Sequence, residues 1–397
     1  MPTCLPPVIR SSRTGNPLKI TSIRAHAAAI PYQIARVTAH EPMRGVSVIL
    51  VEVDTDEGIT GIGQIHGAPL EEIVEWVRRL GEIAVGMNPL EHVAIWNRLF
   101  ALTCPRPGGF LARDGLPAPL PRGARPQITA AIGGIDLALW DIKGKAAGLP
   151  IFRLLGGENR PVPAYATGGY YRDDGQPDGM AEEVASFVDK GFRAVKIKVG
   201  GKTLAEDIER VRLARDAIGR ETLLLLDCTA AYDLDSAVAF SRAVARDNPF
   251  WIEEPLHWYF QPADFRRLAA ATSIPLAHCE RDLHRFTVRD FVVNGGVRYI
   301  QFDSTRHSGF TESLRIATFA EQHGVKISPH QVPELHAHLC AAFPDTSFGV
   351  ESNGVPDPLW SRMYRQRAQI RDGYVHLEET PGFGIEIDWD FIKHHAA

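Results

Sequence analysis

Two lysines lie one residue apart in the apolar stretch "FRAVKIKVG", residues 192–200. The apolar residues around them predict a β-strand, in which successive side chains alternate between the two faces. Lys196 and Lys198 therefore point to the same side of this strand. Because lysine is rarely buried without a partner, the pair indicates that acidic groups or an anion face it.

A reactive residue also ends each of the six predicted strands that follow. These residues are Asp227, Glu253, Glu280, Asp303, His330 and Glu351. A polar residue often caps the helix after a strand, but capping does not account for so many consecutive strands. If the strands form a parallel barrel, these side chains converge at its C-terminal face, where barrel enzymes have their active sites.

Three of these carboxylates, Asp227, Glu253 and Glu280, would lie close together. Like charges in a confined site cannot all remain ionised without compensation. Three carboxylates without matching histidine or cysteine ligands favour Mg²⁺, with water and substrate oxygens completing an octahedron. Cys228 and Cys279 adjoin two of the ligands, but strand alternation should turn their thiols away.

Groups able to move a proton lie on both sides of this predicted metal site. Lys196 and Lys198 come from one strand and His330 from another. A lysine beside a cation and a second lysine should have a lowered pKa, which suits a general base. Asp303 would hydrogen-bond the imidazole of His330 and fix its tautomer. The arrangement fits removal of a proton next to a carboxylate, with Mg²⁺ stabilising the enediolate.

The elements that must position these residues fall into two parts. Strands followed by helical patterns predict a small α+β domain over residues 18–155, after a loose tail at 1–17. Over residues 156–352, eight short apolar runs alternate with amphipathic helices, as parallel βαβ units do. We expect a (β/α)8-type barrel there; a doubly wound open sheet is the alternative.

The composition of the 397-residue chain, 45% hydrophobic and 23% charged, is typical of a soluble globular protein. Its net charge of −5 argues against a nucleic-acid partner. No apolar stretch approaches the ~20 residues that a membrane span needs, and the first residues lack the core of a signal peptide. Five cysteines without a CxxC pair predict reduced thiols in a cytoplasmic protein.

The ordered set of strand-end residues, beginning with "KIK", resembles the enolase superfamily, mandelate racemase subgroup. "GGIDLALWDIKGKAAGLPIFRLLGG" and "ETPGFGIEID" are similar to the segments where that family enters its barrel and returns from it. The resemblance implies a modified (β/α)7β barrel whose mouth is covered by the α+β domain. It also implies that residues 353–397 return to this capping domain and that the protein is a homo-oligomer.

The resemblance implies a role for each residue that matches the family motif. Asp227, Glu253 and Glu280 match the metal ligands. Lys198 matches the base of the second strand, and Lys196 would lie beside the substrate carboxylate.

On the other side of the metal, His330 and Asp303 match the family's catalytic dyad, and Glu351 would support a carboxylate oxygen of the substrate. Thr229 replaces an asparagine that is common in relatives, and it would contact metal-side water or the substrate. The sequence around the third ligand, "AHCERDLHRF", also departs from the relatives, so the substrate is open.

Several other residues are candidates for substrate contacts. The segment 35–45, "ARVTAHEPMRG", is short, polar and bounded by strands, as a lid should be, and it carries Arg36, His40 and Arg44. His257 in "LHWYF" would line the barrel mouth or pack against the next helix.

Other polar residues near the strand ends could have a purely structural role. Arg306 and His307 would reach a polyol or serve structure only. We expect His336 and His338 to be structural because residues two apart on a helix face different ways. Glu254 should point away from the metal.

With the family resemblance, the sequence predicts a Mg²⁺-dependent lyase that dehydrates a sugar acid to a 2-keto-3-deoxy acid. Lys198 or His330 would remove the proton α to the carboxylate, and His330 is the better candidate for the acid that assists loss of the β-hydroxyl. A racemase or epimerase is the alternative, because bases on both faces permit it equally well. A non-catalytic barrel that binds a ligand is a remote third possibility.

Overall fold

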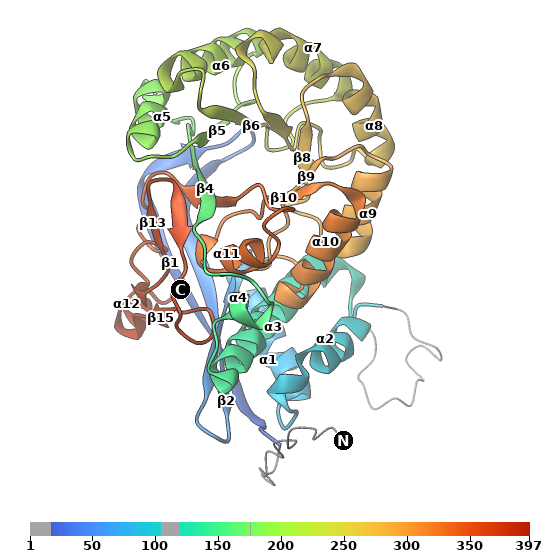
Figure 1. Ribbon diagram of the computed structural model, residues 1–397, viewed down its shortest axis with the longest axis vertical. Helices are drawn as coiled ribbons and strands as arrows, with labels where there is room; N and C mark the ends of the chain where they lie inside the picture. The colour runs from blue at the N-terminus through green and yellow to red at the C-terminus, as the bar shows by residue number, and fades with distance from the viewer. Residues whose placement is uncertain (1–16, 105–119, 175) are drawn as a thin grey trace, which may run out of the picture.

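The computed structural model describes residues 17–104, 120–174 and 176–397. The tail expected at residues 1–17 lies, apart from Pro17, outside the described residues. The described chain forms an α+β capping domain and an α/β barrel, which share the C-terminal segment (Figure 1).

An antiparallel sheet and three long helices make up the capping domain. Its strands are β1 (Ile20–Val37), β2 (Pro42–Thr55) and β3 (Thr60–Ile65), paired in that order. Its helices are α1 (Leu70–Ala84), α2 (His92–Ala101), α3 (Arg125–Ala147) and the short α4 (Ile151–Leu154), with 3₁₀ turns at Pro89–Glu91 and Arg122–Ala124.

Helix α3 lies directly on the sheet because β3 carries glycine where the two meet. A Cβ atom at Gly63 would stand 1.9 Å from the carbonyl oxygen of Gly134, and one at Gly61 would stand 2.1 Å from that of Ala138. Any side chain at these positions would separate the helix from the sheet. The opposite side of α3 packs on α10 of the barrel, so most of this helix is buried.

The segment 35–45, expected as a separate polar lid, is the end of a long hairpin. Strand pairing continues to Arg36↔Met43 and Val37↔Pro42, after a register shift beyond Pro31. Val37 and Tyr171 exchange two backbone hydrogen bonds of 3.0 Å, which attach the hairpin to the barrel. The strands that were expected to bound this segment continue into it, which its short polar sequence does not indicate.

Eight parallel strands form the barrel, and each lies within a predicted apolar run or extends at most one residue beyond it. They are β4 (Val162–Gly168), β5 (Ala194–Lys198), β6 (Leu223–Asp227), β7 (Trp251–Glu253), β8 (Leu276–His278), β9 (Tyr299–Ile300), β10 (Lys326–Ile327) and β11 (Val350–Asn353). They pair in chain order, and β11 pairs with β4. Hydrogen bonds from Ile327 N to Thr346 O (2.9 Å) and from Phe348 N to Ile327 O (2.8 Å) join β10 to the segment before β11.

The connecting helices form the outer ring seen in Figure 1. They are α5 (Met180–Asp189), α6 (Leu204–Ile218), α7 (Leu234–Val244), α8 (Pro262–Ala271), α9 (Arg285–Val293), α10 (Gly309–His323) and α11 (Pro333–Ala342), with a 3₁₀ turn at Ala245–Asp247. After β11 the chain continues into short strands instead of a further barrel helix. The modified (β/α)7β barrel is thereby confirmed.

The C-terminal segment connects the barrel to the cap. It contains β12 (Tyr364–Gln366), β13 (Gln369–Arg371), β14 (Tyr374–His376), β15 (Glu386–Ile387) and α12 (Trp389–His394). Strand β14 pairs with β4, while the last residues hydrogen-bond to β1, through Ala29 N to His395 O at 3.0 Å and Ala397 N to Ala27 O at 3.1 Å. The cap is therefore held against the barrel by both of its chain connections.

Aromatic residues fill the interior of the barrel below the strand ends. Tyr165 and Trp251, both fully buried, meet edge-on with ring centroids 5.6 Å apart. The ammonium group of Lys196 lies 5.8 Å above the Tyr165 ring centroid. This packed layer supports the charged residues above it. Among the described residues, no helix has the length and apolar character needed to cross a membrane.

Candidate active site

Strand register brings the first four predicted site residues side by side. Lys198 on β5 pairs with Asp227 on β6, and Asp227 pairs with Glu253 on β7. Because residues in register on parallel strands lie next to one another, their side chains share one end of the barrel. We call the group Lys196, Lys198, Asp227 and Glu253 the lysine side of the site.

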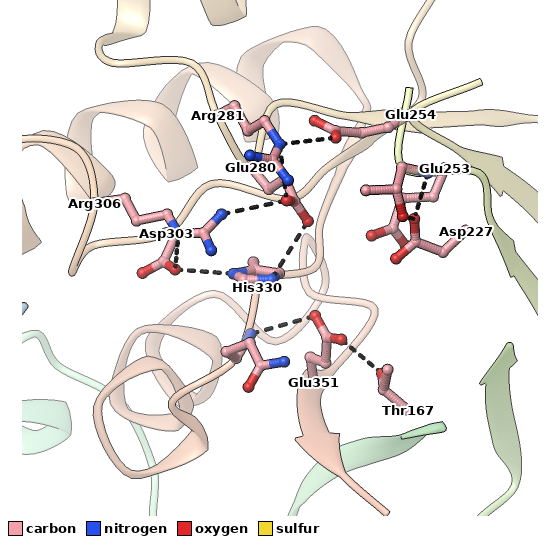
Figure 2. Close-up of polar contacts among 12 residues, drawn as sticks. Thr167, Asp227, Glu253, Glu254, Glu280, Arg281, Asp303, Arg306, His330 and Glu351 are labelled. Atoms are coloured by element: carbon pink, nitrogen blue, oxygen red, sulfur yellow. Dashed lines mark hydrogen bonds and ion pairs between the residues drawn. The ribbon is translucent and has the colours of Figure 1, made fainter. Parts of the chain in front are cut away.

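Asp227, Glu253 and Glu280 form a buried carboxylate cluster (Figure 2). One oxygen from each lies within 4.8 Å of the others. The Oε2 atom of Glu253 is buried and has no hydrogen-bond partner in the described part of the chain. Burial and the nearby Asp227 raise the pKa of Glu253 well above its usual range, although Lys196 opposes the shift. Glu253 therefore has a positive partner, Lys196, at Oε1 only, and its Oε2 faces none in the described part of the chain.

Both lysines of β5 are buried in ion pairs. Lys196 Nζ lies 2.7 Å from Glu253 Oε1, 2.8 Å from Glu351 Oε1 and 3.4 Å from Asp227 Oδ2, and Lys198 Nζ pairs with Asp227. The two ammonium groups thus pair with three carboxylates, those of Asp227, Glu253 and Glu351, and none of these ion pairs includes Glu280. The acidic groups that the buried pair required are present.

The ion pairs of the two lysines shift their pKa upwards, whereas the lowered pKa expected from the sequence assumed a cation beside them. Burial lowers the pKa of Lys198, but the neighbouring acidic groups, Asp227 foremost, together outweigh burial and raise the pKa above its ordinary value. Lys196 is shifted in the same direction, mainly by Glu253 and Glu351 against burial. Conversely, Lys198 and Lys196 outweigh burial at Asp227 and lower its pKa to about 2. The expectation considered the neighbouring lysine and a cation but left out the direct contact with Asp227.

The donor set fits a hard divalent cation. It consists of carboxylate oxygens on three adjacent strands, one of them without a partner, and no thiol or imidazole belongs to it. Mg²⁺ prefers such oxygen ligands and keeps further positions for water or substrate. Cys228 and Cys279 are buried in the apolar core, as strand alternation predicted.

Across the cluster from the lysines, His330 forms a hydrogen-bonded pair with Asp303. His330 Nδ1 lies 2.9 Å from Asp303 Oδ2, and its Nε2 lies 3.4 Å from Glu280 Oε2. The backbone N–H and hydroxyl of Thr305 donate to Asp303 Oδ1 at 2.8 and 2.7 Å. Burial raises the pKa of Asp303, but the hydrogen bond from His330 and the nearby His66 and Arg306 together outweigh burial and hold the pKa well below its usual range. An ionised Asp303 directs the Nε2 atom of His330 towards the cluster.

His66, which follows β3 of the cap, joins the same group. Its Nδ1 lies 3.8 Å from Asp303 Oδ2, and its ring stacks on His330 with centroids 5.9 Å apart. Arg306 is 3.3 Å from His66 Nε2 and 3.6 Å from Asp303 Oδ2. Two histidines and an aspartate are also a possible metal set, but the guanidinium beside them disfavours a second cation. We call Asp303, His330, His66 and Arg306 the histidine side.

Glu351 on β11 closes the ring of charged groups. Its Oε1 accepts from the hydroxyl of Thr167 at 2.6 Å and faces Lys196, and its Oε2 accepts from Gln331 N at 3.3 Å (Figure 2). Burial raises the pKa of Glu351, but Lys196 together with His330 and Lys198 outweighs burial and lowers the pKa. Glu351 is therefore fixed as an anion beside Lys196.

Backbone strain concentrates at these strand ends. Left-handed φ angles occur at Thr229 (47°), Glu254 (39°), Cys279 (92°) and Gln331 (55°), each within two residues of a predicted ligand or of His330. Such conformations cost ~1–3 kcal/mol each and gather at functional sites. The residue types at these four positions do not predict left-handed backbone conformations.

The other predicted substrate contacts lie around the mouth. Thr229 donates its N–H and hydroxyl to Asp227 Oδ1 at 2.9 and 3.1 Å, and its carbonyl oxygen is a hydrogen-bond partner of the His40 ring. The guanidinium of Arg36 lies 4.7 Å from the Tyr32 ring centroid. His257 accepts from Tyr259 N within its own loop, and no described hydrogen bond links it to the charged residues.

The histidines expected to be structural make hydrogen bonds inside the fold. His336 partners the Gln331 carbonyl and the Ser304 hydroxyl, while His338 accepts from Phe152 N and faces the Phe383 carbonyl. His307 accepts from Asp303 N at 3.1 Å.

Arg44, the third residue proposed for the lid, pairs with Asp173 at 3.0 Å on the outside of the hairpin. Glu254 points away from the carboxylate cluster towards Arg281 (Figure 2).

Sequence reasoning missed three neighbours of the site. His66 belongs to the cap and is 240 positions from Arg306, its partner. Arg281 follows Glu280 and lies 3.4 Å from it, and Tyr170 lies with its ring centroid 5.5 Å from Lys198 Nζ. The "RDLHRF" sequence after the third ligand was the available signal for Arg281.

A carboxylate cluster at the C-terminal ends of barrel strands, with a lysine and a histidine on opposite sides and an α+β cap, defines a class of barrel proteins. The comparisons identify which one. Residues 19–156 match the profile of the mandelate racemase/muconate lactonizing enzyme N-terminal domain, and residues 179–391 match that of the enolase C-terminal domain-like family. The chain belongs to the mandelate racemase/muconate lactonizing enzyme family of the enolase superfamily.

Characterised relatives resemble the chain over most of its length. It is 29% identical over 364 residues to L-talarate/galactarate dehydratase of Salmonella typhimurium, covering 90% of this chain and 85% of that one. It is 30% identical over 366 residues to D-galactonate dehydratase of Xanthomonas oryzae, covering 87% and 90%. A racemase from Streptomyces coelicolor, crystallised with magnesium, superposes with a TM-score of 0.83 at 26% identity, covering 95% and 100%.

Proposed function

We propose that the protein is a Mg²⁺-dependent lyase that removes the proton α to the carboxylate of a sugar acid and eliminates the β-hydroxyl, giving a 2-keto-3-deoxy acid. The observation that carries the proposal is the position of the carboxylate cluster between Lys198 and His330, with the unpartnered Glu253 Oε2 within it. A carbon acid bound at this cluster would have a proton-transfer group on each side.

Asp227, Glu253 and Glu280 would hold the metal. Bound Mg²⁺ would supply Lewis-acid stabilisation of the negative charge that develops on the carboxylate as the α-proton leaves. Crystal structures of a racemase and of L-talarate/galactarate dehydratase with magnesium, both of similar fold, support this assignment.

The residues around the cluster have complementary roles in this proposal. Lys196, held between Glu253 and Glu351, would bind the substrate carboxylate by a charge-assisted hydrogen bond. Lys198 would take the α-proton in its neutral form, which requires Asp227 to bind the metal instead of the ammonium group. His330, oriented by Asp303, would give a proton to the departing hydroxyl. The elimination balances, because one proton enters Lys198, one leaves His330, and water departs. The enol that remains becomes the 2-keto-3-deoxy acid when its C2 hydroxyl loses a proton and C3 gains one.

Dehydration is favoured over the alternative by the relatives, since both curated relatives described above are sugar-acid dehydratases. A racemase or epimerase uses the same two faces, and one of the similar structures is a racemase. The decisive experiment incubates the enzyme with Mg²⁺ and a library of acid sugars in D₂O. A dehydratase gives a keto acid, which a colour reaction specific for keto acids detects. A racemase gives deuterated substrate or its epimer and no keto acid.

A protein that only binds ligands would give neither product. Calorimetry separates that case further, because a barrel without catalytic function has no need to retain Mg²⁺ affinity. A homo-oligomer remains our prediction, to be measured by light scattering at several protein concentrations.

A further inference from the structure

A cavity of about 540 Å³ lies between the cap and the barrel. Ser47 and His66 line it from the cap, and Arg281, Leu283 and Arg306 line it from the barrel. None of its described lining residues is acidic. Its size is within the ~300–1,000 Å³ of small-molecule sites, and its only full charges are two guanidinium groups.

This cavity adjoins the histidine side of the candidate active site. Arg306 Nη1 lies 3.3 Å from Glu280 Oε1, and Figure 2 shows Arg306 and Arg281 flanking Glu280. His66, which also lines the cavity, stacks on His330. A ligand that starts at the carboxylate cluster and passes His330 therefore reaches the cavity.

Arg281 has donors available for such a ligand. Its Nε lies 3.4 Å from both Glu254 Oε2 and Glu280 Oε1, and its guanidinium lies 5.2 Å from the ring centroid of Trp258. Its two Nη groups donate no hydrogen bond within the described part of the chain. The ion pairs and the indole hold the guanidinium plane, so it presents a preorganised fork for a carboxylate.

The lysine side carries a rival arginine in a different setting. Arg36 lines a cavity of about 170 Å³ together with Asp178 and Glu183. These two carboxylates would repel an anion there, and the cavity is less than a third as large. The larger cavity, without acidic lining, is the better anion site.

We propose that the substrate is a dicarboxylic sugar acid whose second carboxylate is bound in this cavity by Arg281, with Arg306 beside it. The proposal rests on the proposed function for the first carboxylate, at Lys196. A monocarboxylic acid of the same length would place a hydroxymethyl group next to the two arginines and leave the Arg281 fork unfilled. Discrimination between the two acids follows from that lost charge-assisted pair.

The test compares pairs of six-carbon acids of identical configuration, one with a carboxylate and one with a hydroxymethyl group at the far end. We expect the wild-type holoenzyme to favour the diacid in kcat/KM by tenfold to a hundredfold, the range of a charge-assisted hydrogen bond. Arg281→Met should reduce this ratio towards one, and Arg281→Lys should give an intermediate ratio. Arg289→Met, on the exposed face of α9, is the matched control and should keep the wild-type ratio.

Three results would overturn the proposal. The first is equal turnover of the monoacid and the diacid by the wild-type enzyme, which would leave the dehydratase assignment intact. An equal loss for both acids in Arg281→Met would make Arg281 a support for Glu280 only. Loss of the ratio in Arg36→Met but not in Arg281→Met would move the second carboxylate to the lysine side.

Calorimetry with the Mg²⁺-loaded protein keeps the two proposals separable. If no acid is turned over, the proposed function fails, and the binding of the same acid pairs then decides on the cavity. Tighter binding of the diacid that depends on Arg281 would support the cavity assignment. Equal binding, or none, would overturn it.

Discussion

The lysine side of the candidate site comes entirely from adjacent barrel strands, whereas the histidine side also needs the cap. Strand register alone places Lys198, Asp227 and Glu253 next to one another. His330 lies against His66, which the cap supplies. Proton transfer at the lysine side therefore depends on barrel geometry, while the surroundings of His330 change whenever the cap changes.

Charge differs between the two sides as well. Buried ammonium and carboxylate groups compensate one another on the lysine side, where Glu253 pairs with Lys196 through Oε1 and its Oε2 has no partner in the described part of the chain. On the histidine side, Arg306 and Arg281 face a cavity without acidic lining. This difference in charge supports the two proposals above. The metal and the first substrate carboxylate would lie on the lysine side, and the far end of the substrate would lie on the histidine side.

The largest effect expected is that of Glu253→Gln, which removes one of the three proposed metal ligands on the lysine side. Mg²⁺ affinity should be lost, and turnover should fall at least about a thousandfold, since the metal supplies several kcal/mol to such reactions. Calorimetry measures the first effect and a keto-acid assay the second, with circular dichroism to verify the fold. The neighbouring Glu254→Gln should keep Mg²⁺ binding. Unchanged metal affinity in Glu253→Gln would remove Glu253 from the ligand set.

Proton exchange distinguishes the two sides directly. If Lys198 is the base, Lys198→Met should lower α-proton exchange in D₂O by about 10²- to 10⁴-fold, while substrate affinity largely survives. His330→Asn should still exchange the proton but release no keto acid. Lys196→Met should weaken binding of the substrate instead.

The reverse pattern of exchange would contradict this order of events. Exchange that stops in His330→Asn and persists in Lys198→Met would start the reaction on the histidine side. Full activity in Lys198→Met would remove the lysine from proton transfer altogether.

Asp303→Asn should damage the histidine side selectively. The substitution takes away the acceptor for His330 Nδ1, so the imidazole loses both its tautomer and its orientation. We expect turnover to fall about a hundredfold with little change in KM, as for other groups that orient a site from behind. The pH–rate profile is the sharper measurement, and a profile identical to that of the wild type would argue against the dyad.

The lysine side was largely predictable from sequence, and the histidine side only in part. Strand alternation and the alignment of parallel strand ends place Lys198, Asp227 and Glu253 without further information. His66 could not be assigned, because its contact with Arg306 joins positions 240 apart and no motif marks it.

Quantities that depend on distance were also beyond the sequence. The raised pKa of Lys198 follows from its ion pair with Asp227, which strand order alone does not give. In the hairpin at 35–45, β1 and β2 pair with each other and Val37 also pairs with Tyr171, and no residue pattern in the segment marks either contact. Fold class and strand-end residues follow from periodic patterns, whereas cap contacts follow from tertiary packing.

The smallest effect concerns how stability depends on pH on the two sides. Burial, helped by Arg306, lowers the pKa of His66 to about 4. An unfolded histidine has a pKa of about 6.5, so between pH 6.5 and 4 the unfolded chain binds a proton that folded His66 does not. The free energy of unfolding therefore falls as the pH falls through this window. Lys198 acts in the opposite range: its pKa is raised on folding, so its contribution is present below about pH 10 and is lost only as alkali removes the proton.

His66→Gln should flatten the acid limb and leave the alkaline limb unchanged. The slope of unfolding free energy against pH should decrease by up to about 1.4 kcal/mol per pH unit between pH 6.5 and 4, because one titrating group is removed. The acid limb should not vanish, since burial also lowers the pKa of His92 and His338 to about 4. Urea unfolding at constant ionic strength from pH 4 to 8 measures the slope. An acid limb as steep as that of the wild type would mean that His66 is protonated in the folded protein. The lowered pKa of His66 would then be wrong.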